Sequence, residues 1–149
     1  MIYKLPTSVL VLVYTVALEV LLLERAARAG YWQSVTGSLD LPDEPLGRAA
    51  AREVMEETAI DAGRGRLEKW NLVYTFEIYA HWRHRFAPGV THNTEHVFGL
   101  ALPKRVPVTL APDEHVAFAW LPWQEAAAKC FSWSNRDAIR MLGERGVLA

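Results

Sequence analysis

The chain has 149 residues, 51% of them hydrophobic and 22% charged, which is enough for one domain with a substantial core and too few for two. Its formal net charge of -1 gives no overall attraction for nucleic acid or an anionic membrane. The single Cys130 excludes an internal disulfide and a cysteine-based metal cluster, and it fits a reducing compartment. We therefore expect one cytoplasmic domain over residues 1–149, a monomer or weak dimer, that binds a small molecule.

The apolar run at residues 9–23 is the first strong pattern. Glu19 and other polar side chains interrupt it, and no convincing small-residue cleavage site follows, so a signal peptide or membrane span is not favoured. Its density of Val and Leu predicts two buried strands instead, at residues 8–17 and 19–24.

The next segment changes from strand to helix. A short strand is expected at residues 31–36, followed by a loop at 37–45 whose two prolines prevent an earlier helix start. Helical spacing then covers residues 46–58, and a glycine-containing turn at 61–65 separates this helix from the next element.

The middle of the chain predicts more strands. Residues 67–85 are dense in aromatic and β-branched side chains and pair with residues 97–102, across a polar loop at 86–95. A further strand fits residues 116–121. No internal repeat or low-complexity linker divides the chain, which supports one continuous fold.

The last part has helical spacing at residues 123–129 and 135–143. Ser134 or Asn135 is the expected N-cap of the second helix, and Gly143 lies near its expected end. Taken in chain order, these elements predict an α/β (α+β) fold, with helices on the faces of a mixed β-sheet.

The helix at residues 46–58 carries acidic groups where an isolated helix would not favour them. Glu53 and Glu57 are four residues apart with Glu56 beside them, and like charges at that spacing cost about 0.2–0.5 kcal/mol per pair. A helical projection places Glu53 and Glu57 on the inward side, with Leu46, Ala49 and Ala50. Buried carboxylates need a basic partner, a proton or a hard cation, and a single Arg52 among three carboxylates favours the cation.

The spacing around this helix resembles the Nudix hydrolase box, G-x5-E-x7-R-E-U-x-E-E-x-G-U, where U is a bulky aliphatic residue. Seven residues separate Glu44 from Arg52, and the stretch from Arg52 to Ile60 fits the pattern with one exception, Ala59 in place of glycine. The second departure is the loop before the helix. Six residues, rather than five, separate Gly37 from Glu44, so either the loop is longer or Ser38 replaces the glycine.

Five runs outside the box resemble the branch of the Nudix family that hydrolyses dihydroneopterin triphosphate in folate synthesis: residues 32–38, 76–79, 84–91, 93–95 and 132–136. The resemblance implies the Nudix fold, a mixed β-sheet sandwiched between α-helices. It also implies that water cleaves the triphosphate to the monophosphate and pyrophosphate, with Mg²⁺ as cofactor and Mn²⁺ as a substitute. The alternative is a pyrophosphohydrolase acting on dATP or another nucleoside triphosphate, because purines and pterins offer similar edges.

The resemblance also assigns roles to acidic residues. It implies that Glu53 and Glu57 are the principal metal ligands and catalytic groups, with Glu56 close by. Glu114, in a turn before a predicted strand, is the candidate for a further ligand or the general base, although it could be an ordinary solvated acid. Arg52 is expected to orient a glutamate through a charge-assisted pair.

Substrate contacts follow from the same resemblance. Lys4 and Arg25 flank the first two strands and could converge on one end of the sheet to bind phosphate, or could be surface residues. The remaining expected contacts are Thr36, Phe76, Glu77, Ile78, Tyr79 and Ser132. Without the family, Phe76 and Ile78 would be read as core residues of a strand.

Three alternatives to a magnesium-dependent hydrolase are a non-catalytic binding module, a plain scaffold and a zinc protein. A non-catalytic binding module with this fold would have no need of the acidic cluster, and a plain scaffold would carry it only as a solvated face. All five histidines lie between residues 81 and 115, where strand and loop are predicted, and their spacing does not match a helical zinc motif. His84 and Arg85 are instead expected near the phosphate groups of a substrate.

Overall fold

A computed structural model describes residues 2–146. The strands are β1 Thr7–Thr15, β2 Glu19–Arg25, β3 Trp32–Gln33, β4 Val35–Ser38, β5 Arg66–Glu77, β6 His92–Leu102 and β7 His115–Pro122; the helices are α1 Leu46–Thr58, α2 Trp123–Lys129, α3 Trp133–Arg145 and the short 3-10 helices η1 Ala62–Arg64 and η2 Ala80–Arg85. Within the described residues, these seven strands form one mixed sheet with the order β3-β2-β1-β6-β5, while β4 pairs with β1 and β7 with β2. None of the helices in this part of the chain is long and apolar enough to span a membrane.

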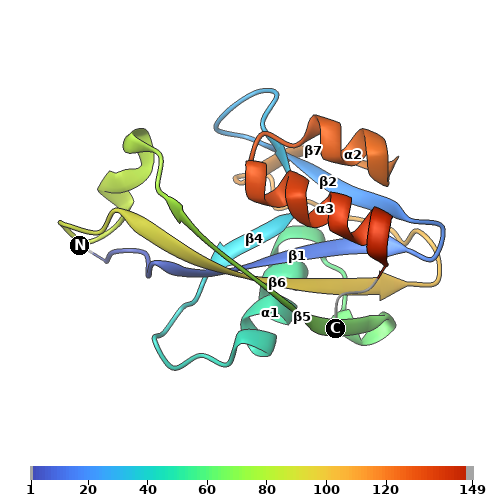
Figure 1. The fold of residues 1–149 in the computed structure, drawn as a ribbon, viewed down its shortest axis with the longest axis horizontal. Helices are drawn as coiled ribbons and strands as arrows, with labels where there is room; N and C mark the ends of the chain where they lie inside the picture. The colour runs from blue at the N-terminus through green and yellow to red at the C-terminus, as the bar shows by residue number, and fades with distance from the viewer. Residues whose placement is uncertain (1, 147–149) are drawn as a thin grey trace.

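The sheet is covered on both faces, by α1 on one and by α2 and α3 on the other (Figure 1). We call the two interiors the α1-side core, which includes Ala49, Ala50 and Val54, and the α3-side core, which includes Ala138, Ile139 and Leu142. Successive β1 side chains alternate between them: Val9 and Val11 enter the α1-side core, and Leu10 and Leu12 the α3-side core. This explains why β1, paired in parallel with β6, is an almost continuous apolar run.

The predicted helix at residues 46–58 is confirmed as α1. Its buried side includes Ala49, Ala50, Glu53 and Glu57, so the inward orientation expected for the two carboxylates is also confirmed. Apolar packing of the rest of this face holds the helix in place despite the repulsion between its acids.

Two stretches expected to be strands are divided in the structure. The expected strand at residues 31–36 is β3 and β4, because Gln33 pairs with β2 and Val35 with β1. Ser34 lies between the two strands, and Asn135 satisfies its polar groups. The backbone N–H of Ser34 donates to Asn135 Oδ1 at 2.7 Å, and the Ser34 hydroxyl accepts from Asn135 Nδ2 at 3.0 Å.

The expected strand at residues 67–85 ends early, at Glu77, and η2 follows it. Arg83 closes the turn, since its Nε donates to the carbonyl of Ile78 at 3.0 Å and its guanidinium pairs with Glu77 at 2.9 Å. The expected polar loop at 86–95 is shorter than predicted, because β6 already begins at His92.

The predicted helix at 123–129 is confirmed as α2, but the ends predicted for the last helix were wrong. Ser132, rather than Ser134 or Asn135, is the N-cap of α3. Gly143 lies inside α3, where an added Cβ would be 2.0 Å from the ring of Trp123, and the chain leaves the helix at Gly146 with φ 77°. Gly143 therefore permits close packing of α3 on α2.

The end of α1 makes a specific demand on Ala59, which takes the left-handed conformation with φ 60° and ψ 19°. An L-residue with a Cβ is disfavoured there, whereas glycine is not. We predict that Ala59→Gly raises the free energy of unfolding by about 1 kcal/mol, measured by urea denaturation.

A matched control is Ala51→Gly, in the middle of the same helix. This change should lower the free energy of unfolding by about 1 kcal/mol, because the backbone there is helical and glycine has more freedom to lose. Equal effects of the two substitutions would contradict a strained left-handed Ala59.

Candidate active site

Two adjoining hollows form one cleft at the end of the sheet where β1 begins and β2 ends. Residues shared by both hollows are Lys4, Arg25, Gln33, Thr36, Gly37, Ser38 and Arg85. One hollow, the acidic half, adds the glutamates of α1 together with Glu114. The other, the aromatic half, adds aromatic and small polar side chains from β5, β6, η2 and the start of α3. The cleft therefore suits a ligand with one ionic end and one flat organic end.

Glu53 and Glu57 are the buried acids of the acidic half, 8% and 2% exposed. Burial raises the pKa of Glu53, and burial together with the charge of Glu53 raises that of Glu57. Glu57 Oε1 has no hydrogen-bond partner within residues 2–146. The pair is thus short of positive charge on the side that faces the cleft.

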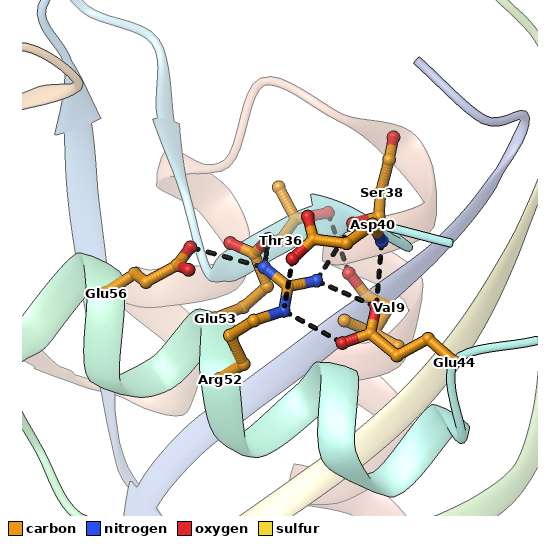
Figure 2. Close-up of polar contacts among 8 residues, drawn as sticks. All are labelled: Val9, Thr36, Ser38, Asp40, Glu44, Arg52, Glu53 and Glu56. Carbon is orange, nitrogen blue, oxygen red and sulfur yellow. Dashed lines mark hydrogen bonds and ion pairs between the residues drawn. The ribbon is translucent and has the colours of Figure 1, made fainter. Parts of the chain in front are cut away.

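Arg52 connects the acids of this region (Figure 2). Its Nε and Nη2 donate to both carboxylate oxygens of Glu44, at 2.9 and 3.1 Å. Its Nη1 donates to Glu53 at 2.9 Å and to Glu56 at 3.3 Å, and Nη2 reaches the carbonyl of Ser38 at 3.2 Å. The hydrogen bonds from Glu44 hold the pKa of Arg52 above its usual value. Arg52 therefore orients glutamates, as predicted, and lies behind the residues that line the cleft.

These acids fit a hard cation that keeps part of its water shell. Within residues 2–146, no three acidic, histidine or cysteine side chains are already arranged around one point as a metal cage, because Arg52 engages Glu53 and Glu56. The unpartnered oxygen of Glu57 nevertheless belongs to a hollow that Glu53, Glu56 and Glu114 also line, and carboxylate oxygens are the ligands that Mg²⁺ prefers.

Glu114 lies in the exposed turn before β7 and lines the same hollow. It is close enough for its charge to raise the pKa of Glu57, after the larger effects of burial and Glu53. A carboxylate from a second element is thus placed opposite α1.

Gly37 allows the closest approach in the site. A Cβ at this position would lie 2.2 Å from the carboxylate of Glu53. Gly37, rather than Ser38, therefore has the role of the box glycine, and the loop is one residue longer. The loop still closes, because the Asp40 N–H donates to Glu44 at 2.8 Å and the Glu44 N–H to the carbonyl of Leu41 at 3.1 Å.

Three cations converge where the two halves meet: Lys4, Arg25 and Arg85. The pKa of Lys4 is lowered by burial of its ammonium group and by the charges of Arg85 and Arg25, and burial and Arg85 lower that of Arg25. None of the three forms an ion pair with an acid in the part of the chain described. Lys4 and Arg25 thus meet as predicted, and uncompensated positive charge there favours an anionic ligand.

Gln33 and His115 support this junction, and sequence reasoning had given them no role. Burial and then the charge of Arg25 lower the pKa of His115 to about 4, so its ring is neutral near pH 7. Its Nε2 lies 3.5 Å from Gln33 Nε2 and 4.0 Å from Glu57 Oε1. Thr36 is the other polar neighbour, and its hydroxyl donates to the carbonyl of Val9 at 2.9 Å.

The aromatic half brings together four of the predicted substrate contacts: Phe76, Ile78, Tyr79 and Ser132. Ile78 is 4% exposed and Phe76 packs against the α3-side core, so both residues belong to the core and also line the cleft. The hydroxyl of Ser132 is already engaged at the start of α3, 3.0 Å from that of Ser134.

Glu77 is the predicted contact that the structure does not bring into the cleft. Alternation along β5 turns its side chain away from Phe76 and Ile78, and its carboxylate pairs with Arg83. It is absent from the lining of both halves among the described residues, so only its backbone is near the aromatic half. His84, expected near the phosphates, is likewise not on the cleft, whereas Arg85 is.

Trp82 and Phe131 complete the aromatic half and were not predicted. Their rings meet edge to face at 6.0 Å, and Tyr79 meets Trp82 in the same way at 5.4 Å. Arg25 lies over the Trp82 ring at 4.8 Å, which links the aromatic half to the cations. For Trp82 the sequence offers only the aromatic composition of residues 67–85, which favours a strand, and Phe131 lies between two predicted helices.

Comparison with known proteins gives consistent matches. Over 141 residues the chain is 46% identical to dihydroneopterin triphosphate diphosphatase of Escherichia coli, covering 93% of this chain and 92% of that protein. It is 37% identical over 142 residues to the protein of the same name from Haemophilus influenzae, with 93% and 87% covered. The solved structure of the Escherichia coli dihydroneopterin triphosphate pyrophosphohydrolase matches with a TM-score of 0.87 at 45% identity, covering 95% of this chain and 97% of that one.

A family model described as the NUDIX domain matches residues 4–142, which include the whole acidic helix and the residues that face it. Nudix hydrolases generally use divalent metal ions, in agreement with the acidic half of the cleft. The match to a whole-family model, the identity to these relatives and the shared fold agree. The chain therefore belongs to the Nudix family of hydrolases.

Proposed function

We propose that this enzyme hydrolyses dihydroneopterin triphosphate to dihydroneopterin monophosphate and pyrophosphate, as a step of folate synthesis. The observation that carries the proposal is the two-part cleft, with unpaired cations and acids at one end and an aromatic hollow at the other. The names of relatives that match over 93% of the chain support the same substrate. Water adds to phosphorus, and the anhydride bond between the α- and β-phosphates breaks. The cytoplasmic location and the monomer or weak dimer expected from the sequence stay predictions.

The acidic half would hold Mg²⁺, or Mn²⁺ in its place, through Glu53, Glu56, Glu57 and Glu114. A divalent cation bound there would neutralise phosphate charge and lower the pKa of a water ligand. Glu53, Glu57 and Glu114 are the candidates for removing a proton from the attacking water. Arg52 keeps Glu53 and Glu56 in position without contacting the substrate.

The protein's own cations would hold the triphosphate across the junction. Lys4, Arg25 and Arg85 lie on both halves of the cleft, so phosphate bound to them would extend from the aromatic half toward α1. The pterin would lie between Phe76, Ile78 and Tyr79 and the start of α3 at Ser132, with Thr36 near the phosphate chain. The same arrangement could take a purine nucleotide, so direct comparison must decide.

We predict that kcat/KM for dihydroneopterin triphosphate exceeds that for dATP at least tenfold, because the aromatic half is built for a pterin. Pyrophosphate release measured with Mg²⁺ and with a chelator provides the comparison, and the chelator should abolish both activities. A tenfold preference for dATP would instead establish a nucleotide pyrophosphohydrolase.

Replacement of Glu57 tests the metal assignment. Glu57→Gln should lower kcat by about a hundredfold or more, because a metal ligand is lost. The protein should stay folded, because the substitution removes a buried carboxylate that has no partner. The increase in thermal midpoint on adding Mg²⁺ should also shrink. Unchanged turnover in this variant would disprove the assignment.

A neighbouring pair of acids tests the role of Glu114. Glu114→Gln should lower kcat at least tenfold, because this carboxylate faces the acids of α1. Asp113→Asn is the matched control: Asp113 is the adjacent acid in the same exposed turn and lines the same hollow, but its charge is not among those that raise the pKa of Glu57, so kcat should change less than threefold. Similar losses in both variants would indicate a general effect of charge in this turn.

A further inference from the structure

Asn93 and Glu95 form the floor of the aromatic half, and the proposed reaction gives neither a role. They are two residues apart on β6 and therefore point to the same side of the sheet, opposite Phe76 and Tyr74 of β5. Each is only 6% exposed, although both line the hollow. A buried acid and a buried amide thus lie side by side beneath the aromatic walls.

Their hydrogen bonding is incomplete in a specific way. Asn93 Nδ2 donates to the hydroxyl of Ser8 at 2.8 Å, which leaves Asn93 Oδ1 without a partner within residues 2–146. Glu95 Oε1 also has no partner in that range. Both free atoms are acceptors, so what the floor lacks is hydrogen-bond donors.

Burial of the Glu95 carboxyl group lowers the stability of the fold. Burial raises its pKa to about 7, although a hydrogen bond with the Ser134 hydroxyl opposes the shift. A side chain needed only for packing would avoid this cost, since buried polar atoms are normally paired. A ligand that brings N–H groups to the floor would supply the missing partners.

The aromatic walls of the hollow and its missing donors together define the ligand. The 2-amino-4-oxo edge of a pterin presents a ring N–H next to an amino group, and one carboxylate can accept from both. We propose that Glu95, supported by Asn93, recognises this donor edge and thereby selects the substrate. The inference rests on the proposed function, because it names the atoms by which the same cleft would recognise the pterin.

The proposal also explains which bases would be rejected. Guanine has the same pair of adjacent donors as a pterin, whereas adenine places a ring nitrogen lone pair beside its amino group. When Glu95 is ionised, above about pH 7, that lone pair would face its carboxylate and leave one oxygen unpaired. A site built on hydrogen bonds to N–H groups rejects ligands that lack them much more strongly than an apolar pocket does.

The test compares kcat/KM of wild type and Glu95→Gln on dihydroneopterin triphosphate, dGTP and dATP at pH 8, where Glu95 is ionised. The amide keeps the size of the side chain but can turn an N–H group toward the donor edge. We expect at least a tenfold loss on dihydroneopterin triphosphate and dGTP, mainly in KM, and no loss on dATP, because a glutamine amide can donate to the ring nitrogen of adenine and accept from its amino group. Glu125→Gln, the same substitution at an exposed site on α2, should leave all three values unchanged.

Stability provides a readout that a purely structural role would not give. Because the folded-state pKa of Glu95 lies above its unfolded value, its ionisation lowers stability as the pH rises through about 7. Glu95→Gln should therefore have an equal or higher thermal midpoint at pH 8. A lower midpoint at that pH, with equal losses on all three substrates, would overturn the proposal and assign Glu95 to packing.

The remaining outcomes separate this inference from the proposed function. A wild-type enzyme that prefers dATP tenfold disproves the proposed function before any variant is considered. A wild type that prefers the pterin, with an unchanged preference in Glu95→Gln, leaves the function standing and overturns the inference. Asn93→Ala is the second variant, with a smaller selective loss expected on the two donor-edge substrates; wild-type substrate ratios in both variants overturn the proposal.

Discussion

The site depends on one constraint, the placement of Glu53 and Glu57 on the buried side of α1. Two like charges at that spacing oppose the helix, and burial adds to the opposition by raising the pKa of both groups. Packing of Ala49, Ala50 and Val54 into the α1-side core holds the helix in place despite this repulsion. Arg52 pairs with Glu53 and Glu56 but not with Glu57, whose unpartnered oxygen is left for a cation that would bind there.

The topology of the sheet supplies the complementary charge. Because β1 and β2 are antiparallel, the start of one and the end of the other meet, and Lys4 and Arg25 meet with them. Arg85 joins them from η2. The absence of ion pairs between these cations and any acid in the described residues keeps both charges available. A substrate that brings negative phosphates together with a positive metal ion would balance both sides at once.

The sequence predicted those features that depend on residues close together in the chain. The limits of α1 and α2 and the inward carboxylates follow from helical periodicity and nearby prolines, and they are confirmed. The break at Ser34 could not be predicted, because it depends on Asn135, 101 residues away. The end of β5 at Glu77 was also missed, because the aromatic and β-branched composition of residues 67–85 favours one long strand, whereas Arg83 closes a turn onto Glu77 and Ile78. Gln33 and His115 also acquire their place only through contacts distant in sequence.

The cleft contains two unsatisfied buried acids, and they differ in what they lack. Glu57 shares its surroundings with other carboxylates, which suits a cation, whereas Glu95 lies beneath aromatic rings beside an amide oxygen, which suits N–H donors. Burial of each acid without a partner lowers the stability of the unliganded fold, and the matching end of the proposed substrate complex would relieve each penalty. A ligand that satisfies one end leaves the other unpaired. On the function proposed above, these two penalties would favour a metal-bound triphosphate carrying a donor-edged ring, in addition to the attraction of Lys4, Arg25 and Arg85 for phosphate.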